Sequence, residues 1–267
     1  ATAFGIARAA HWLERRRLTS HSRAVSLLTL AALVVALLNH RLVGRLPFGF
    51  NYPDTIVTAH TLLADEIAKQ IPQSASVAAH PFLNPHVTQR ERVYIFPTEQ
   101  TVDYAFLDVT TEVSRHPNDV RASVFEWMEQ RGFGIAVGRD GYLLLQRGES
   151  NQTLPDAFFD FARAPNAQPQ YRVEATFGDA VRLIGYDVVA RPREHQVVTR
   201  FYWQALRPLP ADPCTARTGT CARVYPFYHD DAGKIIEDTT QRALIETVWH
   251  PPARWRVGET VMTQMLP

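Results

Sequence analysis

The sequence predicts an α+β protein with one transmembrane helix, a small α/β domain and an antiparallel β-sandwich. Three observations support this: an apolar run near the N-terminus, helices alternating with short strands up to about residue 148, and a period-two pattern from about residue 170. The apolar fraction of 46% and the charged fraction of 21% are those of a folded protein, which excludes a disordered chain.

The apolar run covers residues 24–38, and we interpret residues 24–46 as a transmembrane helix. Its uncharged core is shorter than the about 20 residues that a bilayer requires, but snorkelling by Arg41 and Arg45 extends it. A basic leader before a short apolar core also fits a signal peptide, and a buried helix is a third interpretation. The leader is long and no small-x-small cleavage pattern follows Leu38, which favours the transmembrane helix.

The basic residues gather before this run. Residues 1–45 carry a formal charge of +6 and the other 222 residues carry −5. The positive-inside rule therefore predicts a cytoplasmic basic segment over residues 1–23, and a chain that is extracytoplasmic after about residue 48. Because these charges flank an apolar run and do not form a folded basic face, we expect a lipid bilayer as partner and no nucleic acid.

We predict that residues 52–148 form the extracytoplasmic α/β domain. A helix capped by Asp54 or Thr55 opens it and ends at Pro72. The apolar segments that follow predict three strands, at residues 75–79, 92–96 and 102–109.

The domain closes with a helix and a hairpin. Residues 116–132 predict the helix from a stripe of four apolar residues, Val120, Val124, Trp127 and Met128. Residues 133–148 predict the hairpin, with "RDG" as its turn.

Residues 149–169 predict a linker with a short amphipathic turn, and residues 170–267 predict the β-sandwich. Its strands are "YRVEATFG", "VRLIGYDVV", "HQVVTRFYWQAL", "ARVYPFYHD", "KIIEDT" and "ALIETVW". The final segment "GETVMTQMLP" reads as the beginning of a further strand. The first segment, "ATAFGIARAAHWL", reads as the tail of an earlier apolar helix. We therefore expect a truncated sandwich in a piece of a larger membrane protein.

The two cysteines, Cys214 and Cys221, flank the turn-rich "TARTGT". In an oxidising, exported compartment they would close a small disulfide. Two free thiols are the alternative.

Two segments carry a family resemblance. "IPQSASVAAHPFLNPHVTQRERVYIFP" followed by "VDYAFLDV" resembles the extracytoplasmic segment of a family of predicted multi-pass bacterial membrane proteins, domain of unknown function two thousand and seventy-nine. The later "LIGYDVV", "FYWQALRPL", "DDAGKIIEDT" and "RWRVGET" resemble a β-sandwich often appended to such proteins, and to membrane glycosyltransferases that use polyprenyl-phosphate sugars.

The resemblance covers most of residues 50–267 and implies a relative of the GT-C type membrane glycosyltransferases. Their acidic catalytic residues lie on a loop between early transmembrane helices, and this sequence has no such loop. The resemblance therefore implies that this region has no catalytic centre of its own. The stretch "PADPCTARTGTCARVYPF" is longer than the corresponding strand connection expected from the family, so the disulfide would be specific to this member of the family.

The sequence offers a few ligand candidates. His80 and His86 lie in a loop after a predicted strand, with Arg90 as an anion partner, and Asp108 ends a neighbouring strand beside the His86 loop. Each also has a structural interpretation, as a loop or cap residue. No third ligand at suitable spacing accompanies the histidines, so we expect neither a metal nor a cofactor.

Aromatic residues of the sandwich are candidates for stacking on a sugar. Alternation in "TRFYWQAL" assigns Phe201 and Trp203 to the core and leaves Tyr202 on the other face, with Trp255 as a second candidate. "HDDAGKIIED" lacks the alternating oxygen ligands of a calcium loop and predicts a hairpin turn with Gly233 in a left-handed conformation.

We therefore expect an extracytoplasmic accessory region of a membrane protein resembling GT-C glycosyltransferases, with a polyprenyl-phosphate sugar, a glycan or other membrane-protein subunits as partners. The alternative is a non-catalytic glycan- or protein-binding module in a membrane-associated assembly. A soluble secreted enzyme would require a catalytic constellation that the sequence does not contain.

Overall fold

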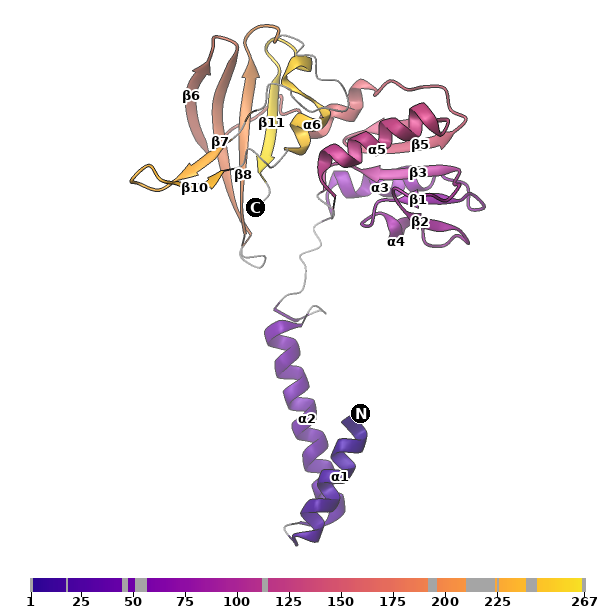
Figure 1. Cartoon of the computed structure of the whole chain (residues 1–267). Coiled ribbons are helices and arrows are strands. Elements are labelled where there is room, and N and C mark those ends of the chain that lie inside the picture. Colours follow the sequence, from indigo (N-terminus) through magenta and orange to yellow (C-terminus); the bar gives the residue numbers. More distant parts are fainter. Residues whose placement is uncertain are drawn as a thin grey trace. The chain divides into compact units, whose positions relative to one another are not determined.

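A computed structural model describes most of the chain in two compact units, Ala1–Ile56 and Val57–Pro267 (Figure 1). The described residues are 2–17, 19–44, 48–50, 57–111, 115–191, 196–209, 224, 226–238 and 244–265. Cys214 and Cys221 lie outside them, so their disulfide stays a prediction.

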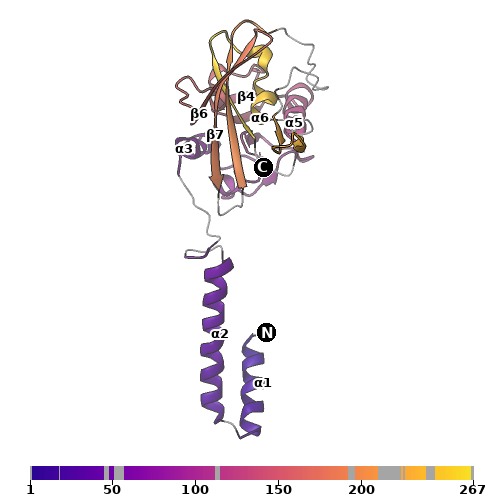
Figure 2. The same ribbon diagram turned by 90° about the vertical axis from the view of Figure 1, so that its left-hand side faces the viewer.

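The first unit is a helical hairpin. Helix α1, Thr2–Arg15, packs along helix α2, His21–Val43, in both views (Figures 1 and 2). At 1.5 Å per residue the 23 residues of α2 span about 35 Å, enough to cross a bilayer core. Helix α2 begins three residues before the predicted span, and most of the predicted basic segment is helical.

The α/β domain is built on a five-stranded sheet in the order β2-β1-β3-β5-β4. Strands β1, β2 and β3 are mutually parallel, whereas β5 runs antiparallel to β3 and β4. The strands are β1 Val77–Ala79, β2 Val93–Ile95, β3 Tyr104–Asp108, β4 Phe133–Arg139 and β5 Tyr142–Arg147.

Two helices cover the opposite faces of this sheet. Helix α3, Ala59–Ala68, packs on the side chains of Val77 and Phe106, whereas helix α5, Pro117–Gln130, packs on those of Ala105 and Leu107. Neighbouring side chains on a strand point to opposite faces, which places the two cores on either side. The carboxyl ends of the three parallel strands meet at one edge.

The helix boundaries follow from capping groups. In α5 the side chain of His116 accepts from the backbone N–H of Asn118, Pro117 takes the first helical position, and the predicted apolar stripe is buried. The cap predicted for α3 is wrong. Thr58, not Asp54 or Thr55, caps this helix, because its hydroxyl accepts the backbone N–H of Thr61.

The hairpin turn between β4 and β5 confirms the prediction from "RDG". Asp140 and Gly141 have φ of 47° and 79°, the two positive values of a type I′ turn. Asp140 N donates to Ala157 O, and Gly141 N donates to Phe158 O. The turn is thus held against the segment that follows β5.

Gly141→Ala is expected to cost more stability than the control Gly148→Ala. Both glycines have positive φ, 79° and 81°, so each alanine carries about 1–2 kcal/mol of left-handed backbone strain. A Cβ at Gly141 would overlap the Thr110 side chain, whereas one at Gly148 meets no atom within 4 Å. The overlap adds about 1–3 kcal/mol. Urea unfolding of both variants in detergent measures the difference; equal losses would contradict the expectation.

The remainder of the second unit is rich in antiparallel strands. A four-stranded sheet has the order β11-β8-β7-β6, and β9 pairs with β10 in a separate ribbon. These strands are β6 Tyr171–Phe177, β7 Val181–Arg191, β8 Gln196–Ala205, β9 Phe227–His229, β10 Ile235–Asp238 and β11 Thr260–Met265. The hydroxyl of Tyr228 on β9 donates to Thr199 Oγ1 on β8 at 3.0 Å. The two-sheet sandwich itself stays a prediction.

Two further segments form short helices. The predicted linker contains a 3-10 helix, η1 Asp156–Ala162, whose Phe158 and Phe159 are buried. The predicted strand "ALIETVW" is wrong, since these residues form helix α6, Ile245–Trp249, beside α5. Ile245 and Trp249 are four residues apart, so one helical turn places both in the α5 core.

Candidate functional site

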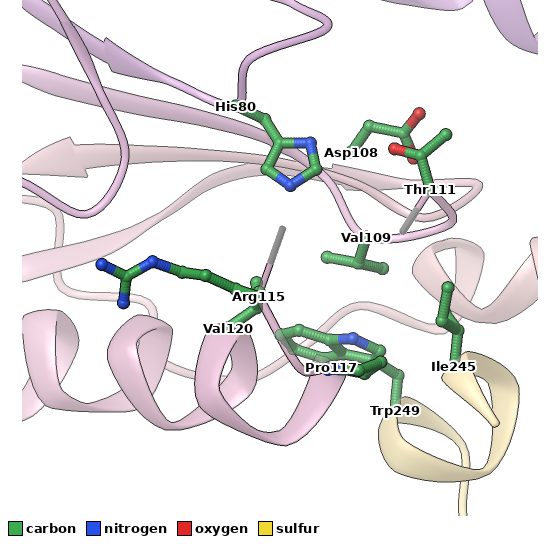
Figure 3. A pocket seen from close by; sticks show the side chains of 9 residues that line it. All are labelled: His80, Asp108, Val109, Thr111, Arg115, Pro117, Val120, Ile245 and Trp249. Atoms are coloured by element: carbon green, nitrogen blue, oxygen red, sulfur yellow. The ribbon is translucent and has the colours of Figure 1, made fainter. Parts of the chain in front are cut away.

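The carboxyl ends of β1 and β3 bring His80 and Asp108 to one cavity (Figure 3). His80 directly follows β1 and Asp108 ends β3, and these two strands are adjacent and parallel. The cavity has a volume of about 10 Å³, near the smallest that holds one water molecule. Its other described lining residues are Val109, Thr111, Arg115, Pro117, Val120, Ile245 and Trp249.

His80 is a buried, neutral imidazole. Only 2% of its surface is exposed, and Nδ1 has no hydrogen-bond partner among the described residues. Burial lowers its pKa, and the nearby negative charge of Asp108 opposes that shift without reversing it. A neutral ring can donate from one nitrogen and accept at the other. His80 thus presents an uncommitted polar group to the cavity.

Asp108 belongs to a charge cluster that sequence reasoning missed. The imidazole of His60, on α3, lies between two carboxylates, with Nδ1 2.7 Å from Asp140 Oδ2 and Nε2 3.5 Å from Asp108 Oδ2. Thr110 donates its hydroxyl to Asp108 Oδ1 at 2.6 Å and its backbone N–H at 2.8 Å. The His60 ring stacks on Tyr142 with 4.3 Å between ring centroids.

The charges of this cluster are mutually stabilising. Burial acts to lower the pKa of His60, but its contacts with Asp108 and Asp140 outweigh burial and raise the pKa to about 9. Burial acts to raise the pKa of Asp108, yet the His60 contact and the Thr110 hydrogen bonds lower it. At neutral pH an imidazolium therefore lies between two carboxylates, and the cluster carries one net negative charge.

The helical periodicity of the sequence could have identified the position of His60. His60 lies three and seven residues before Leu63 and Ile67, both buried on α3, so it belongs to the same helix face. Asp140 was identified only as a turn residue. Nothing local indicates its contact with His60, because the two residues are 80 positions apart.

His86 and Arg90 fasten the loop and do not line the cavity within the described part of the chain. His86 lies on the short helix α4, Asn84–Val87, with Nδ1 2.7 Å from Asp65 Oδ1. The guanidinium of Arg90 donates to the carbonyl oxygens of Ile71 at 2.8 Å and Val87 at 3.2 Å. Asp108 lines the cavity with His80 and contacts His60.

The two aromatic candidates are occupied by internal contacts. Tyr202 donates its hydroxyl to Asp187 Oδ2 at 2.7 Å. Burial, followed by that hydrogen bond, raises its pKa to about 12. Trp255 is only 4% exposed, and its Nε1 donates to His250 O at 2.9 Å. A sugar ring cannot stack on a buried indole, so the structure contradicts that role for Trp255.

A larger hollow of about 340 Å³ lies beside the cavity and follows the carboxyl end of β2. We call it the Arg115 groove. Its described lining is Pro97, Thr98, Glu99, Arg115, Ser123, Glu126, Trp127 and Arg131. Most of these side chains can donate or accept hydrogen bonds, as a sugar or phosphate ligand requires.

Arg115 lines both the cavity and the Arg115 groove. Arg131, by contrast, is committed, since its guanidinium donates to Thr98 O at 2.6 Å and lies over the Trp127 ring. Within the described part of the chain nothing pairs with the Arg115 guanidinium. Of the two arginines described in the groove lining, Arg115 is therefore the one that remains available to an anionic ligand.

Comparison with known proteins identifies the family of the chain. No curated protein and no solved structure matches the chain. A family model described as "Predicted membrane protein (DUF2079)" matches residues 2–144, more than half of the chain, from α1 into β5. The matched part includes His60, His80, Asp108 and Arg115. The chain therefore belongs to the DUF2079 family of predicted membrane proteins.

Proposed function

We propose that the chain after about residue 48 is an extracytoplasmic accessory region of a membrane protein related to the GT-C glycosyltransferases. In this proposal the Arg115 groove holds the phosphate-bearing head group of a polyprenyl-phosphate sugar. The availability of Arg115, between the His80 cavity and a polar groove of about 340 Å³, is the observation that carries the proposal. A bacterial origin is part of the same proposal and rests on the resemblance alone.

The chemistry of the groove suits such a ligand. A guanidinium binds phosphate oxygens through two parallel hydrogen bonds. Glu99, Glu126 and Ser123 line the same groove, where they supply two carboxylate acceptors and a hydroxyl. Sugar hydroxyls form hydrogen bonds with groups of this kind. The groove also lies at the carboxyl edge of parallel strands, where α/β domains commonly bind ligands.

The contacts of Asp108 favour binding over catalysis. A general base needs a carboxylate that is free to take a proton. Asp108 is 5% exposed and already accepts from Thr110 and faces His60, and these contacts lower its pKa. The proposal accordingly gives this region no catalytic centre of its own.

The distribution of charge supports the proposed orientation, which has a direct test. Arg15, Arg16 and Arg17 precede α2 and Arg23 lies in its first turn, which supports an extracytoplasmic location for everything after α2. Alkaline phosphatase fused after Gly49 is expected to be active in cells, whereas a green fluorescent protein fused there is expected to be dark. A bright fluorescent fusion with inactive phosphatase would reverse the orientation.

Arg115→Ala is expected to weaken binding of a short-chain polyprenyl-phosphate sugar by about 10-fold or more, because the charge-assisted bonds to phosphate are lost. Thermophoresis of the full chain in detergent measures the affinity. Arg172→Ala, an exposed arginine on β6, is the matched control and should bind as the wild type does. Equal binding by the Arg115 variant would contradict the proposal. Equal binding of the phosphate-free glycan would favour the alternative glycan-binding module.

A further inference from the structure

The end of α1 and the start of α2 bring together three side chains of types that can ligate a metal ion. His11 and Glu14 are three residues apart on α1, and His21 is the first residue of α2. The Nδ1 atoms of both histidines lie 3.3 Å from the same Glu14 oxygen, Oε2. All three ligand atoms are within 4.8 Å of one another, and all three side chains are exposed.

These spacings lie between those of the other described histidine–carboxylate pairs, since His60–Asp108 and His250–Glu259 are 3.5 Å apart. His60–Asp140 and His86–Asp65 are both 2.7 Å apart, the length of a charge-assisted hydrogen bond. The two contacts of Glu14 are longer, at 3.3 Å. A tetrahedral zinc ion with bonds of about 2.0–2.1 Å separates neighbouring ligand atoms by about 3.3–3.4 Å. The spacing around Glu14 matches the edge of such a tetrahedron.

We propose that His11, Glu14 and His21 bind a zinc ion. Two imidazole nitrogens and one carboxylate oxygen are a ligand set that zinc accepts, and the exposure of the cluster leaves its fourth position to water. The ion fastens the start of α2 to the last turn of α1, at the end of the hairpin that carries Arg15, Arg16 and Arg17. The positive charges of these arginines oppose the binding of a dication. The guanidinium of Arg16 contacts another group, the Trp12 ring, at 5.6 Å from the ring centroid.

The test uses the full chain in detergent, without a histidine tag and after removal of metal with a chelator. Calorimetric titration with Zn²⁺ is expected to show one site, and Co²⁺ is expected to give the visible absorption of four-coordinate cobalt. Glu14→Gln and His21→Ala each remove a ligand, so both should weaken Zn²⁺ binding by more than about 100-fold, beyond the effect of losing a supporting contact.

Two controls separate this site from other donors. His229→Ala removes an exposed histidine elsewhere and should leave the affinity unchanged. A Cys214→Ser/Cys221→Ser variant should also bind Zn²⁺ as the wild type does. Zn²⁺ binding that survives Glu14→Gln and His21→Ala, or that disappears with the cysteines, overturns the proposal. So does a wild-type chain that binds no Zn²⁺.

Discussion

His60→Ala is expected to lower the free energy of unfolding by about 3 kcal/mol. Removing one partner of a buried ion pair typically costs about 3–5 kcal/mol, because the other charge stays buried. Asp108 is 5% exposed and would retain only its Thr110 contacts, while the 26% exposure of the His60 side chain places the loss at the low end. Urea unfolding of the full chain in detergent measures this difference.

A double-mutant cycle makes this expectation specific. Asp108→Asn in the His60→Ala background removes the unpaired buried charge. The double variant should therefore lose less stability than the sum of the losses of the two single variants. His229→Ala, an exposed histidine on β9, should change stability by less than about 0.5 kcal/mol. A His60→Ala loss below about 1 kcal/mol, or strict additivity with Asp108→Asn, would refute the ion-pair assignment.

The same cluster sets a pH dependence. The pKa of His60 is raised from 6.5 to about 9, so its stabilisation is complete below pH 6.5 and is lost as the pH rises through 9. The pKa of Asp108 is lowered, so its contribution is present above its ordinary pKa of 3.8 and is lost in stronger acid. His60→Gln should abolish the alkaline loss of stability, and an unchanged alkaline limb would contradict the assignment.

Trp249→Ala is expected to cost about 4 kcal/mol, in the range for truncating a large buried aromatic side chain. Trp249 is 2% exposed, and its ring packs edge-on against Phe158 with 5.6 Å between centroids. Although it lies between strands β10 and β11 in sequence, it belongs to the core of α5. The variant should therefore destabilise the α/β domain and enlarge the His80 cavity.

Trp249→Phe is the matched control, since it keeps an apolar ring in the same place. We expect it to recover at least half of the stability that Trp249→Ala loses. Thermal unfolding, followed by tryptophan fluorescence and by far-ultraviolet circular dichroism, measures both variants. A Trp249→Ala loss below about 1 kcal/mol would mean that α6 contributes little to this core.

Local patterns predicted much of the fold. The stripe of α5, the positions of β1 to β3 and the hairpin turn at "RDG" depend on periodicity and turn chemistry within a few residues, and the structure confirms them. Helix α6 was predicted as a strand because so short an apolar run does not distinguish the two periods. Its packing on a distant helix determines the outcome.

The candidate site was only partly predictable. His80 and Asp108 followed from the rule that ligands gather at the carboxyl ends of parallel strands. The contact of His60 with Asp140 joins residues 80 positions apart, which local patterns do not encode. Trp255 was misplaced because an aromatic residue in a strand-rich segment suits a sugar platform and a core equally well, and only the packing separates the two.

The most direct test of the Arg115 groove is to map where a ligand touches the chain. A polyprenyl-phosphate sugar carrying a photoreactive diazirine on its sugar would be crosslinked to the full chain in detergent, and the labelled peptides identified by mass spectrometry. The proposal predicts labels within residues 97–99 and 115–131, which line the groove, and their loss in Arg115→Ala. Labels confined to β6, β7 and β8, unaffected by that substitution, would contradict it.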